Sequence, residues 1–79
     1  MEIKVLGAGC ASCKKLYALT QRAVKELNIG ANTLYITDMA KIMQTGIVST
    51  PGLMINGKVK SMGKVPKLKE IMQMISDEL

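Results

Sequence analysis

The stretch EIKVLGAGCASCKK, residues 2–15, changes character twice, and these changes decide the fold. Residues 2–6 form a strand-like run, two glycines interrupt it, and a helical pattern of apolar residues begins at about Ala11. The only two cysteines of the chain, Cys10 and Cys13, lie where the strand gives way to the helix. This stretch therefore predicts a strand–turn–helix unit with two thiols at the turn.

The helix predicted over residues 11–27 has one apolar face, whose residues recur at spacings of three and four. Asn28 follows the last of them and is typical of a helix C-terminus, because asparagine tolerates the left-handed conformation. Cys13 falls on the inward face, whereas Cys10 precedes the helix body and is expected to be accessible. The residues of this face are Cys13, Leu16, Thr20, Ala23, Val24 and Leu27.

Strands and helices alternate along the rest of the chain. The further predicted elements are a strand over 32–37 with Leu34 and Ile36 on one face, a short helix over 39–44, strands over 52–56 and 58–61, and a helix from near Pro66 to Leu79. Asn56-Gly57 is typical of a tight hairpin between the last two strands. The order predicts an α/β fold, a β-α-β-α-β-β-α sandwich with a four-stranded mixed sheet flanked by three helices.

Length and composition point to one small globular unit. The chain has 79 residues, which predicts a single domain spanning residues 1–79. Apolar residues make up 48% of the chain, enough for a compact core. Aromatic residues are nearly absent, so the seven methionines are expected to fill core volume.

Charge and hydropathy narrow the expected partners. The net charge is +5, but the lysines lie on short separate elements, and there are too few aromatic residues to stack bases on. No apolar run approaches the roughly 20 residues that span a bilayer, and no signal-peptide pattern is present. We expect a cytoplasmic monomer that binds neither nucleic acid nor membrane.

The position of the two cysteines predicts reactive thiols. The first N–H groups of a helix have no carbonyl partner and carry a partial positive charge, which favours a thiolate. Thiols so placed have pKa values of about 3.5–7.5, against about 8.5 when free, so we expect the pKa of Cys10 to be lowered. A spacing of three residues also suits a disulfide. We expect Cys10 to attack a partner disulfide and Cys13 to resolve the mixed disulfide.

Two other interpretations stay open on these residues. A pair of soft thiolates also suits Cu(I), and small copper chaperones carry CxxC between a first strand and a first helix, although their fold ends on a strand. The fold could instead serve as an interaction domain without redox turnover. Structural zinc is disfavoured because it takes four ligands, and the chain has two cysteines and no histidine.

A second motif, STPG at residues 49–52, precedes the third predicted strand. By itself Pro51 would simply begin an edge strand, where its missing N–H does no harm. The whole order, strand–CxxC–helix–strand–helix–TP–hairpin–helix, resembles the thioredoxin and glutaredoxin superfamily. The length and the GCASC and TPG segments resemble its small redox-active-disulfide proteins.

The resemblance implies a thiol–disulfide oxidoreductase whose only redox group is the Cys10–Cys13 disulfide. It implies a cis bond before Pro51, a backbone at Thr50 that pairs with the partner, and a glycine turn at Gly63 beside the bound substrate. The implied partners are disulfide-containing proteins and an upstream reductase, and no metal or other cofactor is implied.

Overall fold

The computed structural model describes residues 1–79, and its elements follow the predicted order. They are β1 (Glu2–Leu6), α1 (Ala11–Leu27), β2 (Asn32–Ile36), α2 (Met39–Gln44), β3 (Gly52–Ile55), β4 (Lys58–Met62) and α3 (Leu68–Ser76). The strands form one sheet in the order β2-β1-β3-β4, in which β1 is parallel to β2 and antiparallel to β3. The predicted α/β fold class, with a mixed four-stranded sheet and three helices, is confirmed.

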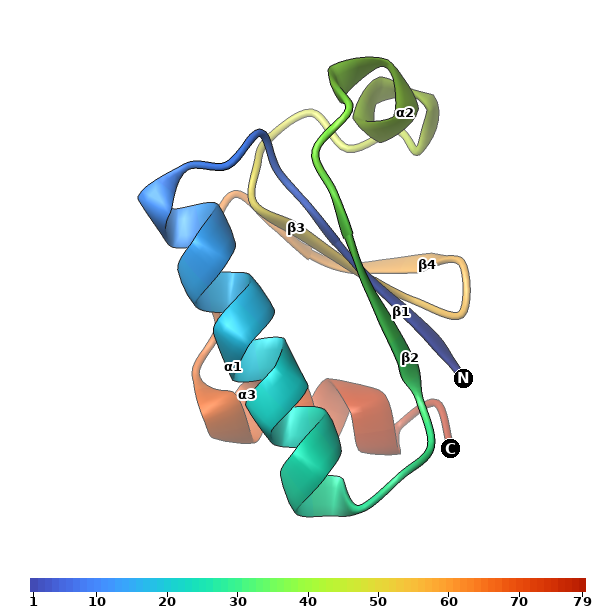
Figure 1. Ribbon diagram of the computed structural model, residues 1–79. Helices are drawn as coiled ribbons and strands as arrows, with labels where there is room; N and C mark the ends of the chain where they lie inside the picture. Colours follow the sequence, from blue (N-terminus) through green and yellow to red (C-terminus); the bar gives the residue numbers. More distant parts are fainter.

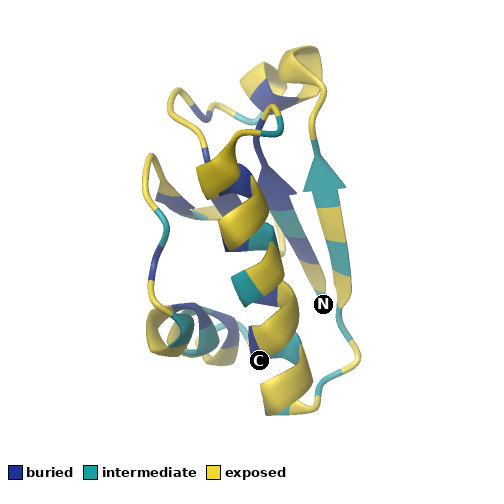
Figure 2. Ribbon diagram, turned by 60° about the vertical axis from the view of Figure 1, so that its left-hand side comes forward, coloured by how far each residue is buried: buried dark blue, intermediate teal, exposed yellow.

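The helices divide the core into two clusters of unequal size. α1 and α3 pack together against one face of the sheet, and α2 lies near the ends of β1 and β2 (Figure 1). Figure 2 shows the solvent side of α1 exposed and its sheet side buried. The main cluster contains Ile3, Val5, Leu16, Ala23, Leu53, Ile55, Ile71 and Ile75. The smaller cluster, which we call the α2 cluster, contains Leu6, Ile42, Ile47 and Met54.

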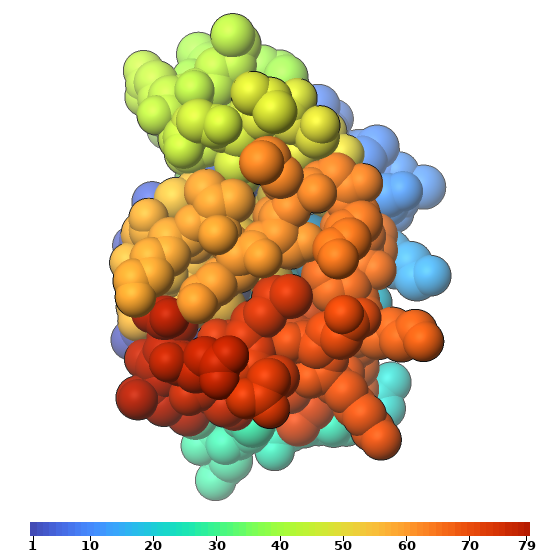
Figure 3. Space-filling model, turned by 180° about the vertical axis from the view of Figure 1, so that it is seen from behind, coloured from blue at the N-terminus to red at the C-terminus, as the bar shows by residue number.

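The hairpin between β3 and β4 forms where Asn56-Gly57 predicts it. Asn56 and Gly57 have φ angles of 51° and 81°, the left-handed values that a tight two-residue turn requires. β4 is an edge strand, and the segment that follows α3 holds it in place. Glu78 forms ion pairs with Lys60 at 2.7 Å and with Lys58 at 3.1 Å, and Figure 3 shows this last segment beside β4.

β2 presents the opposite side chains to the main core from those the alternation indicated. Tyr35 packs against the main cluster and stacks on Tyr17 of α1, with ring centroids 4.9 Å apart and planes 26° from parallel. Leu34 lies on the other face and is 44% exposed. The pairing of Val5 with Tyr35 fixes this choice, because Val5 itself faces α1.

α3 is shorter than predicted. It begins at Leu68, two residues after Pro66, because the Glu70 carboxylate accepts the Lys67 N–H at 3.0 Å and so defines the N-terminus. It ends at Ser76, and Leu79 is 73% exposed, so the prediction that Leu79 extends the apolar face is wrong.

The methionines are not all core residues. Met54 is the only one that is buried, whereas Met39, Met43 and Met62 are 46–72% exposed. The expectation that methionines replace aromatic volume in the core fails for these three. No helix in the structure combines the length and the hydropathy that crossing a membrane requires.

Candidate active site

The turn from β1 into α1 places Cys10 at the start of the helix. Gly7, the first residue after β1, donates its N–H to the Ile36 carbonyl at 2.9 Å, which extends the parallel pairing by one bond. Cys10 then takes extended backbone angles as the N-cap, and its carbonyl accepts the Lys14 N–H at 3.0 Å. The next residues enter the helix, so Cys10 stands at its positive end.

The two cysteines form a disulfide, with their Cα atoms 5.1 Å apart. The Cys13 N–H donates a hydrogen bond to the Cys10 sulfur at 3.1 Å. This N–H is one of the helix donors that lack a backbone partner, and the sulfur takes the place of the usual capping oxygen.

The two sulfurs differ in their access to solvent. Cys10 is exposed, whereas Cys13 is fully buried beneath the turn. Gly7 creates the space for Cys13: a Cβ atom at residue 7 would lie 2.7 Å from the Cys13 Cβ and would overlap its sulfur. Sequence reasoning missed this role, because it took the glycines of GAG only as the end of a strand. No local pattern signals this role, because Gly7 stands three residues before Cys10 and meets Cys13 only in the folded chain.

Thr50 and Pro51 lie at the same end of the sheet as the disulfide. The peptide bond between them is cis. The next residue, Gly52, pairs with Leu6 at the end of β1, directly before the turn that carries Cys10. β3 is an interior strand, so the expectation that Pro51 begins an edge strand is wrong. Pro51 stands before the first ladder residue, where its missing N–H leaves the sheet intact.

Gly63 lies against the same loop. Its N–H donates to the Pro51 carbonyl at 3.0 Å, and its φ angle of 76° is one that glycine adopts without strain. A Cβ at this position would come within 3.2 Å of the Ser49 Cβ. The structure therefore places Gly63 beside Thr50-Pro51, although these residues are far apart in the sequence. Thr50 and Gly63 are exposed, and Pro51 is buried.

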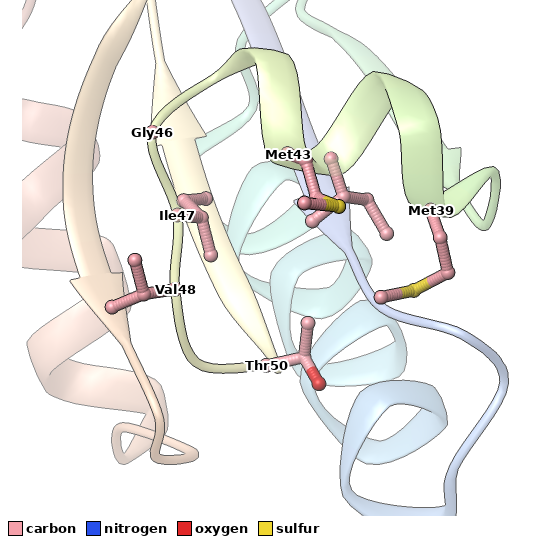
Figure 4. Close-up of a pocket in the computed structure, with 7 residues that line it drawn as sticks. Met39, Met43, Gly46, Ile47, Val48 and Thr50 are labelled. Atoms are coloured by element: carbon pink, nitrogen blue, oxygen red, sulfur yellow. The ribbon is translucent and has the colours of Figure 1, made fainter.

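A hollow of about 400 Å³ adjoins this loop, and we call it the methionine pocket. Its walls come from α2 and from the chain that leads to Pro51. In Figure 4, the Met39 side chain of α2 extends towards Thr50 of the loop, and Met43 and Ile47 line the hollow above and to the left of Thr50. Sequence reasoning missed this pocket because it assigned the methionines to the core. The signal was that Ile42 already supplies the buried side of the short α2 helix.

The donors for a metal ion are few. No group of three or more histidine, cysteine, aspartate or glutamate side chains comes together in the structure.

A disulfide at the start of the first helix, with a cis-proline loop at the same end of a β2-β1-β3-β4 sheet, defines a thiol–disulfide redox protein of the thioredoxin-like class. The chain belongs to the thioredoxin domain family, whose pattern matches residues 1–76. A thioredoxin of Methanothermobacter thermautotrophicus is 40% identical over 76 residues, covering 96% of this chain and 99% of its own length. A thioredoxin of Methanocaldococcus jannaschii is 32% identical over 77 residues, covering 98% and 88%.

These findings assign the chain to thiol–disulfide redox chemistry. They give the copper alternative no support, since the relatives are thioredoxins. The last element of the structure is α3, a helix, whereas the copper chaperones considered above end on a strand.

Proposed function

We propose that this protein reduces disulfides of partner proteins by dithiol exchange, with Cys10 as the attacking thiol and Cys13 as the resolving thiol. The observation that carries the proposal is the difference between two bonded sulfurs. Cys10 is exposed and accepts a helix N–H, whereas Cys13 is fully buried. Only the exposed sulfur offers a line of approach to a disulfide in another molecule.

The reaction has two exchange steps. In the reduced protein the Cys10 thiolate attacks one sulfur of the partner disulfide, forming a mixed disulfide and releasing the other partner sulfur as a thiolate. The Cys13 thiolate then attacks the Cys10 sulfur, closing the internal disulfide and releasing the second partner thiol. Two electrons pass to the partner, and an upstream dithiol reductase restores the Cys10–Cys13 thiols by the reverse exchange.

The loop at residues 49–51 has the features of a docking site for the partner backbone. Thr50 is exposed, and neither its N–H nor its carbonyl forms a hydrogen bond within the chain. In the proposal these two groups pair with an extended segment of the partner. Pro51 and Gly63 give the loop its shape, and the adjoining methionine pocket receives a partner side chain.

The proposal includes no cofactor beyond the redox-active disulfide. It treats the protein as a cytoplasmic monomer, in keeping with a compartment where closely spaced cysteines serve catalysis more often than structural bridging.

Two cysteine variants test the proposal. The reduced protein is expected to cleave the interchain disulfides of insulin, followed by the appearance of free thiols. Cys10→Ser should abolish this activity, because no accessible thiolate remains. Cys13→Ser should still attack but not resolve, so it should accumulate disulfide-linked partners that dissociate when dithiothreitol is added.

The two variants act as controls for each other, because each keeps one thiol. If Cys10→Ser captures partners as well as Cys13→Ser does, the assignment of roles is overturned. If Cys10→Ser retains the cellular activity of the protein, the interaction-domain interpretation replaces the redox one.

A further inference from the structure

The basic residues of the chain divide into two groups according to whether a carboxylate lies within ion-pairing distance. One group is paired, and its N–O distances run from 2.7 to 3.4 Å. These residues are Lys4, Arg22, Lys58 and Lys60. Their charges are compensated, and all four belong to strands or to the body of α1.

The other group includes four exposed lysines on the start of α1, on α2 and on the turn after β4, segments that lie at the same end of the sheet as the disulfide. Lys14 and Lys15 directly follow Cys13, Lys41 lies on α2, and Lys64 follows Gly63. None of these four forms an ion pair. Of the six carboxylate side chains in the sequence, only that of Asp38 lies next to one of these lysine-bearing segments, at the start of α2. Asp38 caps α2 by accepting the Ala40 N–H at 2.9 Å.

These lysines border the docking loop from two directions. Lys14 and Lys15 lie on the first turn of α1, next to the disulfide. Lys64 comes from the other side, because the preceding Gly63 is hydrogen-bonded to the Pro51 carbonyl. A chain segment that pairs with Thr50 and reaches Cys10 therefore lies at an end of the sheet where the neighbouring lysines have no ion-pair partner.

Uncompensated charge of one sign around a site selects its partners. Such a field raises the association rate of oppositely charged ligands by about 10- to 1,000-fold and repels ligands of the same sign. The effect falls with salt, because the Debye length shrinks from about 30 Å at 0.01 M to about 3 Å at 1 M.

We propose that the partner segment that docks beside the Cys10–Cys13 disulfide is acidic, with aspartate or glutamate residues flanking its reactive cysteine. This inference rests on the proposed function. It adds the chemistry by which the protein distinguishes one disulfide from another.

Three peptides test it. Each carries one cysteine joined as a disulfide to mercaptoethanol, and they differ only in four flanking residues, which are Asp, Ser or Lys. The measurement is the second-order rate constant of reduction by the reduced protein, divided by the constant for dithiothreitol so that the intrinsic reactivity of each disulfide cancels. The Asp peptide should react about 10-fold faster than the Lys peptide at 0.01 M salt. The ratio should approach one at 1 M salt.

Charge reversals locate the effect. Lys15→Glu and Lys64→Glu, made as single variants, should each reduce the preference for the Asp peptide. Lys25→Glu is the matched control, because Lys25 is also exposed and unpaired but lies on the last turn of α1. At 0.15 M salt it should leave the Asp-to-Lys rate ratio within about 2-fold of the wild-type value, because the Debye length there is about 8 Å and Lys25 lies at the far end of α1 from the disulfide. A change in thiolate reactivity alters all three rates together, so the ratio does not depend on it.

The outcomes separate this inference from the proposed function. Equal normalised rates for the Asp and Lys peptides overturn the acidic-partner inference and leave the reductase intact. An equal loss of preference in Lys25→Glu also overturns it, because the effect would then belong to net charge alone. Failure to reduce even the Ser peptide overturns the reductase itself.

Discussion

The Cys13 side chain packs so closely against Gly7 that no side-chain atom can be added at residue 7 without displacement. The Cys13 sulfur lies where a side chain at residue 7 would otherwise stand. Gly7 does not adopt a positive φ angle, so its requirement is for space rather than for an unusual backbone. The sheltered position of Cys13 therefore depends on a residue that takes no part in the chemistry.

Gly7→Ala should destabilise the oxidised protein by about 1–3 kcal/mol, because the added methyl group must displace Cys13 or the backbone of β1. It should also slow closure of the internal disulfide. Chemical unfolding of the oxidised form measures the first effect, and the rate at which the mixed disulfide resolves measures the second.

Gly30→Ala is the matched control, because Gly30 has open space around its would-be Cβ and no positive φ angle. It should leave both quantities near wild type. Equal effects in the two variants would show that glycine content, and not the contact with Cys13, matters.

Site features that depend on neighbouring residues in the sequence were predictable, whereas those that depend on contacts formed in the fold were not. The Cys10–Cys13 disulfide and its place at the start of α1 follow from local spacing and from the helical pattern, which the sequence expresses directly. Gly7 and Met39 depend on what the folded chain brings next to them. Sequence patterns carry no such information, so one was taken as a strand break and the other as core filling.

The edge strand β4 and the end of the chain form one coupled unit through Glu78. Its side chain is 12% exposed and lies between Lys58 and Lys60. The hydrogen bond from Lys60, and then that from Lys58, holds the pKa of the Glu78 carboxyl below its ordinary value of 4.5. The folded state therefore favours the ionised form of this residue more than the unfolded chain does.

Glu78→Gln should lower the thermal unfolding temperature at pH 7 and have little effect at acidic pH. A lowered folded-state pKa gives stability that is fully present above the unfolded pKa and is lost as the pH falls through the folded one. The wild-type advantage should therefore shrink as the pH falls below 4.5 and disappear only below the lowered folded-state pKa, where Glu78 is protonated in both states. Unfolding curves at several pH values measure this difference.

Glu26→Gln provides the comparison at the same net charge. Glu26 pairs with Arg22 at 3.4 Å, but both side chains are largely exposed, so the pair should contribute little at any pH. A pH-independent difference between wild type and Glu78→Gln would contradict the assigned role of the Glu78 carboxylate.

Element boundaries were predictable where a local signal marks them. Asn28 ends α1 in the left-handed conformation, and Asn56-Gly57 makes the hairpin, both as the sequence indicates. The face of β2 and the end of α3 were not predictable in this way. The pairing of β2 with β1 decides which face of β2 is buried. No residue of the sequence marks the end of α3 at Ser76.

Two hydrophobic clusters of different size stabilise the fold. The main cluster joins α1 and α3 to the sheet, whereas the α2 cluster holds one six-residue helix through Ile42. Since α2 carries Met39 and Met43, the methionine pocket depends on the smaller of the two clusters.

Ile71→Ala should therefore affect the stability of the whole fold, whereas Ile42→Ala should affect mainly α2. Both remove a buried isoleucine, a change that costs about 2–5 kcal/mol. Ile71→Ala should lower global stability and speed hydrogen exchange across the sheet. Ile42→Ala should act mainly on the amides of α2 and slow the reduction of protein substrates more than that of a small neutral disulfide. Uniform exchange in Ile42→Ala would contradict the division into two clusters.

The stacked pair of Tyr17 and Tyr35 has a practical consequence of its own. The chain contains no tryptophan and no other tyrosine, so all of its ultraviolet fluorescence arises from these two rings. Tyr17 lies on α1 and Tyr35 on β2, so both rings lie where this helix contacts the sheet. The tyrosine fluorescence of this protein therefore reports directly on whether α1 stays packed against β2.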